Sequence, residues 1–430
     1  MRRKINVWTN IDWFTVILYV LFVIMGWLNI YSAVYNEEHQ SIFDLSQRYG
    51  KQLLWIGAAF LLAVLIMIID SNFFSFFAYG FYIIMIILLI AVLFFGEEIH
   101  GSKAWLKFGS IRFQPAEFAK IATALAISRY LSAFNVELNS IKGYLRVAGL
   151  ILLPFGLIFI QDAGSALVFF VFLLPLYREG LSSAVLLLGL YVIILFILSF
   201  LLDKLILALG SIILVHFIFF YFTRNLRNTI LALLIFAVST AILRGINELI
   251  PKDFALLYLM LGGFLFASVF YLIFSYWYKI TRIPILIIFV FGSIGFTYSV
   301  DYVFDNFLQP HQQRRIVQIL GVEDSPHGAG YNVNKSKIAI GSGCFSGKGY
   351  LKGTQTKYDF VPEQSTDFIF STIGEEWGFI GSFVIVFLYV TLLLRLLFLA
   401  ERQRSHFSRI YGYGVLSILF IHFMINIGMT

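Results

Sequence analysis

Charged residues are scarce in this 430-residue sequence. Asp, Glu, Lys and Arg make up 13% of it, whereas hydrophobic residues make up 60%. A soluble domain carries about twice that charged fraction, so the composition excludes an ordinary soluble domain and indicates a chain embedded in a lipid bilayer. The 48 Phe and 23 Tyr fit a large lipid-facing surface with aromatic belts.

The sequence has only one cysteine and no phosphate-binding loop. The single cysteine, Cys344, excludes an intramolecular disulfide framework and a cysteine-ligated metal cluster. The stretch around Gly347 is not a P-loop, because Ser342 stands where the first glycine is required and Gly349 follows Lys348 where Ser or Thr is required. A nucleotide-binding function is therefore not indicated.

Long apolar runs are present instead. A helix needs roughly twenty apolar residues to span a bilayer, and thirteen such runs occur, at 14–34, 51–70, 73–95, 115–134, 145–161, 163–178, 182–202, 204–222, 228–248, 254–275, 283–300, 366–396 and 409–428. The first run is too long for a signal peptide and lacks a small-residue cleavage site, so it is a retained span. We predict an all-α polytopic membrane protein of about 13 transmembrane helices, within a range of about 10 to 14.

The basic residues predict the orientation. They cluster at 1–4, around Arg178, and at 223–228, 277–282 and 401–409, all on one side of the predicted membrane. The positive-inside rule makes that side cytoplasmic, including the N-terminus, so the net charge of +7 does not indicate nucleic acid. Residues 1–430 then form a single integral membrane domain with one large external loop at 301–365.

This external loop is rich in glycine. Eight glycines lie between residues 321 and 353, at 321, 328, 330, 341, 343, 347, 349 and 353. Glycine permits turns with positive φ and lets backbone amides approach a ligand closely. A flexible loop is the plain alternative, but residues that favour burial, among them Tyr331 and Phe345, indicate order. Loops of this length are usually functional or disordered, so we expect a functional segment.

Charged residues near the apolar spans are further candidates, because charge inside a membrane is costly. Glu117 and Lys120, spaced i, i+3, share a helix face and can pair; a purely structural ion pair is the alternative. Asp162 stands at a helix junction, where it can also serve as an N-cap. Arg48 precedes the second span, where it can instead be an interfacial snorkelling residue.

The predicted external face therefore combines carboxylates, cations and glycines. A carboxylate such as Asp324 can act as general base for a hydroxyl, while cations and backbone amides can hold a phosphate. Such a face suits a substrate with a lipid tail, an anionic head and hydroxyl groups.

Six stretches of the sequence, in this order, resemble the SEDS family (shape, elongation, division and sporulation) and its RodA branch. They are GSKAWLKFGSIRFQPAEFAK, QDAGSAL, HQQRRI, GAGYNVNKSKIAIGSG, GKGYLKGTQTKYDFVPEQSTDFIF and IGEEWGFIGS. The resemblance implies a glycosyltransferase that polymerises lipid II, an undecaprenyl-pyrophosphate-linked disaccharide-peptide, into peptidoglycan during cell elongation. It also implies a class B penicillin-binding protein and other elongation-complex membrane proteins as partners, in the bacterial cytoplasmic membrane.

The resemblance also implies roles for individual residues. The family's external aspartate directly precedes the proline of a D-P-x-G-x-G-Y motif; here Ser325 has that position, so Asp324 is the predicted catalytic residue and Glu323 the alternative. The predicted substrate-binding residues are Arg48, Glu117, Lys120, Asp162, Lys337, Lys348, Gln355, Glu363 and Asp367. No metal ligands are predicted. The sequence does not decide whether a divalent cation such as Mg²⁺ is a cofactor.

Two departures from the family pattern and two rival functions complete the prediction. Region 182–300 is longer than usual, and the sequence stops at HFMINIGMT before the family's proline-rich motif, as expected of a truncated copy.

In the implied reaction, Asp324 deprotonates the 4-hydroxyl of the acceptor sugar, which displaces undecaprenyl pyrophosphate with inversion, while Arg48 and Lys120 offset the developing charge. The rivals are a lipid II flippase and a non-catalytic cell-wall scaffold.

Overall fold

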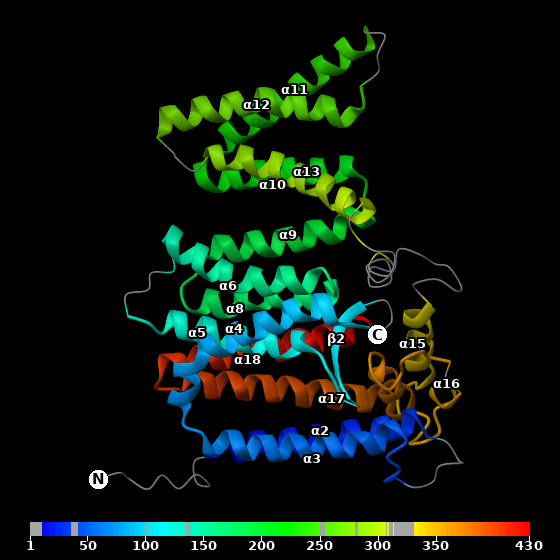
Figure 1. Cartoon of the computed structure of the whole chain (residues 1–430). Coiled ribbons are helices and arrows are strands. Elements are labelled where there is room, and N and C mark those ends of the chain that lie inside the picture. Colours follow the sequence, from blue (N-terminus) through cyan, green and yellow to red (C-terminus); the bar gives the residue numbers. More distant parts are fainter. Residues whose placement is uncertain are drawn as a thin grey trace. The chain divides into compact units, whose positions relative to one another are not determined.

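The computed structural model describes residues 11–35, 42–99, 102–109, 111–134, 138, 140–249, 254–279, 283–306, 308, 313, 331–358 and 360–430 (Figure 1). The chain divides into two compact units. Unit 1 comprises Met1–Leu186 and Glu323–Thr430, and unit 2 comprises Leu187–Val322.

All thirteen predicted apolar runs form helices, as expected. Those of unit 1 are α2 (Trp13–Ala33), α3 (Arg48–Ile68), α4 (Ser71–Phe95), α5 (Pro115–Leu131), α6 (Ile141–Phe159), α7 (Ala163–Leu167) with η1 (Val168–Phe172) and α8 (Leu173–Arg178), α17 (Ile369–Glu401) and α18 (His406–Gly428). Those of unit 2 are α9 (Ser183–Leu201, whose first turn falls in unit 1), α10 (Lys204–Thr223), α11 (Leu226–Glu248), α12 (Leu256–Tyr278) and α13 (Ile283–Asn306). Within the described residues, 11 of these helices are long and apolar enough to cross a membrane, which makes this a multi-pass membrane protein.

Polar residues at the helix starts explain where the helices begin. Asp70 accepts a hydrogen bond from Asn72 N at the start of α4, and Ser140 accepts one from Gly143 N at the start of α6. Pro115 occupies the first turn of α5, where a missing N–H costs nothing. Glu117, also in that first turn, is favourable beside the positive end of the helix dipole.

α5 lies at the centre of unit 1. Ala116, Ala119 and Ala124 are buried along it, and α4 and α18 pack against it. Small residues let helix backbones approach closely in membranes; a Cβ added at Gly414 of α18 would lie 3.1 Å from that of Ala124. This close packing holds α18 against the face of α5 that carries Lys120.

A small sheet departs from the all-α prediction. Strands β1 (Glu97–Ile99), β2 (Ser102–Phe108) and β3 (Ile111–Phe113) form an antiparallel sheet in the order β1-β2-β3, between α4 and α5. No apolar run of spanning length covers residues 97–113, so no helix is predicted there. Glu97 pairs with Lys107 and Arg112 across the sheet, at 3.3 and 3.5 Å.

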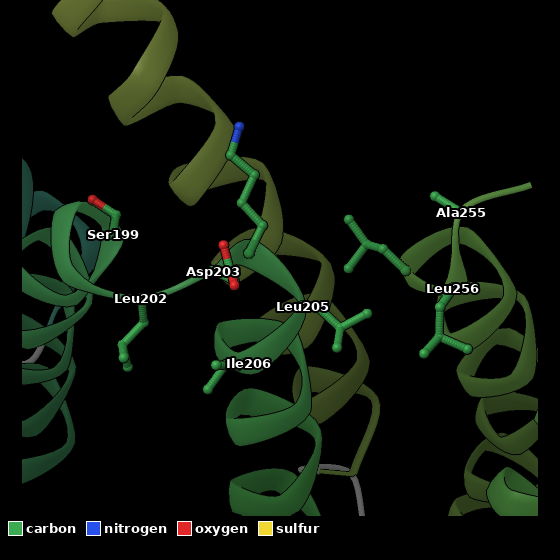
Figure 2. A pocket seen from close by; sticks show the side chains of 9 residues that line it. Ser199, Leu202, Asp203, Leu205, Ile206, Ala255 and Leu256 are labelled. Carbon is green, nitrogen blue, oxygen red and sulfur yellow. The ribbon is translucent and has the colours of Figure 1, made fainter.

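Unit 2 has its own aromatic and aliphatic core, formed by α10, α11, α12 and α13 around residues such as Phe219, Phe264 and Tyr271. A cavity of about 660 Å³ lies in this unit, beside the starts of α10 and α12. Figure 2 shows the side chains that line this cavity. It is lined by Ser199, Leu202, Asp203, Lys204, Leu205, Ile206, Ala255, Leu256 and Leu257. No residue of the predicted site lines it.

The segment between α13 and α17, predicted as an external loop at 301–365, contains short helices. α13 continues to Asn306, into the range assigned to the loop, and the segment itself contains α15 (Tyr331–Ser342) and α16 (Thr354–Lys357). Both helices contact α17, and α16 also contacts α2 (Figure 1). Residues 314–330 lie outside the described part of the chain.

Candidate functional site

The glycine-rich segment packs against the first turns of α17. The amides of Lys348 and Gly349 donate to the carbonyls of Glu375 and Glu376 at 3.0 and 2.9 Å. Gly347 has φ +78°, and a Cβ there would lie 2.1 Å from the Glu376 carbonyl oxygen, so a side chain does not fit. These backbone amides therefore bond to α17, whereas their predicted approach to a ligand stays a prediction.

Glu375 anchors this segment. Its side chain is fully buried, and its carboxylate accepts hydrogen bonds from Lys348 Nζ at 2.6 Å and from the amides of Gln355 and Thr356 at 2.8 and 2.9 Å. A buried carboxylate is tolerated only when it is paired and hydrogen-bonded. Two predicted substrate-binding residues, Lys348 and Gln355, are thereby held on α17 through this one carboxylate.

Glu376 attaches the same segment to α2. It is also buried, and accepts hydrogen bonds from the Ser32 hydroxyl and, at 3.1 Å, from the Leu351 amide. The Tyr350 hydroxyl donates to the Leu28 carbonyl at 3.1 Å. Burial raises the pKa of Tyr350 to about 12, so the phenol keeps the proton that it donates.

Arg48 and Glu363 meet at the other end of the segment. Arg48 Nη1 donates to Ser365 Oγ at 2.6 Å and lies 3.5 Å from Glu363 Oε2. Next to them, Gln364 Nε2 donates to the carbonyls of Ala33 and Thr356, at 2.8 and 2.6 Å. The start of α3 is thus joined to the segment that precedes α17, and two predicted site residues are brought together.

The predicted Glu117–Lys120 ion pair is confirmed, with 2.8 Å between Glu117 Oε2 and Lys120 Nζ. The Lys120 side chain is 2% exposed and that of Glu117 is 45% exposed. Lys120 Nζ also lies 2.7 Å from His422 Nε2 on α18, a contact that was not predicted. One turn further along α18, Asn426 Nδ2 donates to the Asp367 carbonyl at 3.0 Å, which links the end of the external segment to the same helix.

The remaining predicted residues are placed as follows. Asp162 is the N-cap of α7, as predicted, and accepts hydrogen bonds from Gly164 N and Ser165 Oγ at 3.1 and 2.7 Å. Lys337 is exposed on α15. Asp324 and its alternative Glu323 fall in 314–330, outside the described residues.

Sequence reasoning missed three residues at the centre of this arrangement. Glu375 and Glu376 lie inside the predicted run 366–396, and His422 lies inside 409–428. The criterion that selected Glu117, an ionisable group within an apolar run, applies equally to all three. In the described part of the chain, no group of three or more His, Cys, Asp or Glu side chains is arranged to hold a metal ion.

Comparisons with known proteins agree with these motifs. The family model FtsW/RodA/SpoVE, described as "Cell cycle protein", matches residues 12–235 and 213–430. The peptidoglycan glycosyltransferase RodA of Treponema pallidum (strain Nichols) is 29% identical over 98% of this chain and 90% of that protein. The peptidoglycan glycosyltransferase MrdB of Escherichia coli (strain K12) is 28% identical over 100% of this chain and 86% of that protein.

Solved structures show the same fold. A chain from a structure described as "Structural coordination of polymerization and crosslinking by a peptidoglycan synthase complex" matches with a TM-score of 0.60 and 21% identity, covering 98% of this chain and 87% of that chain. The rod shape determining protein RodA of Thermus thermophilus matches with a TM-score of 0.54 and 20% identity, covering 98% and 85%. With motifs, family model and fold in agreement along nearly its whole length, the chain belongs to the FtsW/RodA/SpoVE family of cell cycle proteins, the SEDS family.

Proposed function

We propose that this protein is a peptidoglycan glycosyltransferase that polymerises lipid II into glycan strands during cell elongation. The observation that carries the proposal is the match of the whole chain to RodA and MrdB, both named peptidoglycan glycosyltransferases. The buried polar contacts that hold the external segment on α17 and α2 support it, because a segment fixed in this way can position a bulky, lipid-linked substrate.

In the proposed reaction Asp324 is the general base. It takes the proton from the 4-hydroxyl of the acceptor sugar, the oxygen attacks the anomeric carbon of the donor, and undecaprenyl pyrophosphate leaves with inversion at that carbon. Arg48 and Lys120 offset the charge that develops on the pyrophosphate. Glu117 keeps Lys120 in place through the 2.8 Å ion pair.

The proposed setting is the bacterial cytoplasmic membrane, with the N-terminus in the cytoplasm and the segment 331–368 outside. The partner is a class B penicillin-binding protein that cross-links the new strands. The related chain in the peptidoglycan synthase complex, whose description joins polymerisation to crosslinking, supports this assignment.

The test supplies lipid II to the purified protein in detergent and resolves the glycan product on a gel. We expect polymer from the wild type and a loss of about 100-fold or more in Asp324→Ala, the usual contribution of a general base. Asp203→Ala is the matched control, because Asp203 is an exposed aspartate at the start of α10 whose side chain makes no capping hydrogen bond.

The outcomes separate the alternatives. Equal activity of Asp324→Ala and wild type would remove Asp324 from the scheme, and loss in Glu323→Ala alone would move the role to Glu323. A wild type that makes no glycan, but carries lipid II across a vesicle bilayer, would favour the flippase. A wild type that does neither, yet still binds the transpeptidase, would favour the scaffold.

A further inference from the structure

His422 has a place beside Lys120 that the proposed reaction does not yet use. Its Nε2 atom lies 2.7 Å from Lys120 Nζ, and His422 is exposed whereas Lys120 is buried. Lys120 belongs to α5 and His422 to α18, so the contact joins two of the helices packed at the centre of unit 1.

The chemistry of the contact determines the protonation of the imidazole. A lysine ammonium has three donors and no acceptor, so His422 Nε2 must accept the hydrogen bond. Glu117 Oε2 lies 2.8 Å from the same Nζ and forms an ion pair with it. A neutral imidazole that accepts at Nε2 carries its proton on Nδ1, so the tautomer of His422 is set by Lys120.

The Nδ1–H group is available to a ligand. Among the described residues no hydrogen-bond partner is recorded for Nδ1, and His422 is exposed. The ammonium at Nε2 polarises the ring, because hydrogen bonds in a chain strengthen one another in a low-dielectric environment. The result is a strengthened donor that carries no full charge of its own.

The depth of the residue indicates what it meets. His422 lies six residues before the end of α18 at Gly428, and Lys120 lies five residues after the start of α5 at Pro115. At 1.5 Å per residue, both are about 8 to 9 Å from those helix ends. The end of α18 lies beside the segment that precedes α17, since Asn426 contacts Asp367. A donor at that depth can reach the phosphates of a lipid head group.

We propose that His422 is a substrate-binding residue: the Lys120–His422 pair presents Nδ1–H to a pyrophosphate oxygen of the lipid-linked substrate. The inference rests on the proposed function, because it deepens the same site. It identifies a donor for the diphosphate beyond Arg48 and Lys120.

The experiment measures binding of undecaprenyl pyrophosphate to the purified protein in detergent, with undecaprenyl phosphate as the comparison probe. His422→Leu removes both contacts of the ring. His422→Gln keeps an acceptor near the Nε2 position and loses the donor, whereas His422→Asn keeps a donor near the Nδ1 position and loses the contact with Lys120. We expect Leu and Gln to weaken binding of the diphosphate by about 10- to 100-fold, the equivalent of one hydrogen bond to a charged group, and Asn to retain most of it.

Tyr389→Phe is the matched control. The Tyr389 hydroxyl donates to the Leu419 carbonyl at 3.2 Å, so this variant removes a hydrogen bond to α18 without touching Lys120. Size-exclusion chromatography and thermal unfolding show that each variant is folded.

The outcomes separate this inference from the proposed function. If the wild type binds the diphosphate but makes no glycan from lipid II, the function fails and the binding site stands. The inference is overturned if the wild type does not bind the diphosphate, or if His422→Leu binds it as tightly as the wild type. It is also overturned if Gln retains binding while Asn loses it, because His422 would then act only by positioning Lys120.

Discussion

The two units of this protein differ in whether they bury charged side chains. Among the described residues, the charged residues that are at most 2% exposed are Lys120, Glu375 and Glu376, and all three belong to unit 1. The acidic and basic residues Asp, Glu, Lys and Arg are not among the buried residues described in unit 2. Several of its buried polar side chains form hydrogen bonds within their own helix; Ser211 Oγ, for example, donates to the Leu207 carbonyl at 2.8 Å. Buried charge in a membrane is costly and usually functional, so we expect the chemistry in unit 1, whereas the core of unit 2 is built by apolar packing.

The largest expected effect tests the anchor of the external segment. Glu375→Ala leaves Lys348 Nζ and the amides of Gln355 and Thr356 without their acceptor. Breaking a buried ion pair on one side costs about 3 to 5 kcal/mol, so we expect a strong fall in the thermal unfolding temperature in detergent. Glu401→Ala, at the far end of the same helix in an exposed pair with Arg178, should change little. Equal effects would show that Glu375 is not an anchor.

The second test compares glycines of the two units. Gly378 has φ 63° and ψ −158° inside α17, and a Cβ there would lie 2.3 Å from Gly347 N. Only glycine adopts this conformation easily, so Gly378→Ala should destabilise the protein by about 3 kcal/mol from backbone strain and steric clash. Gly292→Ala in α13 of unit 2 meets nothing within 4 Å and should be neutral or stabilising by about 0.5 to 1 kcal/mol. Thermal unfolding of the two variants and the wild type measures both changes in stability.

The helices could be predicted from the sequence because each apolar run carries its own signal. The run 163–178 does not form one continuous α-helix, because it is divided into α7, η1 and α8. The composition of the glycine-rich segment predicts a functional role, which stays a prediction, but α15 and α16 have no apolar periodicity strong enough to predict them.

The site was predictable only where its contacts are local. The Glu117–Lys120 pair and the Asp162 cap are three residues or fewer apart, so spacing alone predicted them. The Lys348–Glu375 and Lys120–His422 contacts span 27 and 302 residues. Such contacts depend on which helices pack together, and no pattern in the sequence fixes that.

A third test uses pH on an ion pair of unit 1. The guanidinium of Arg395, together with the Thr15 hydroxyl, holds the pKa of Asp12 well below its ordinary value of 3.8. A carboxylate with a lowered folded-state pKa stabilises the protein above its unfolded-state pKa, and this stabilisation is lost as the pH falls further. The difference in unfolding temperature between wild type and Asp12→Asn should therefore be constant near pH 7 and shrink below about pH 4. A difference that grows on acidification would contradict the assignment.

The smallest effect is expected in unit 2. Lys204, at the start of α10, pairs with Asp301, which lies in the last turns of α13. The two side chains are 40% and 30% exposed. Ion pairs exposed to this degree contribute less than about 1 kcal/mol to stability. Lys204 Nζ also lies 4.5 Å from the centre of the Tyr298 ring, and a methionine side chain can partly replace this contact. Lys204→Met should therefore leave both the unfolding temperature and glycan synthesis close to wild type. A loss as large as that of Glu375→Ala would show that unit 2 also depends on charge, and the division of labour between the units would be wrong.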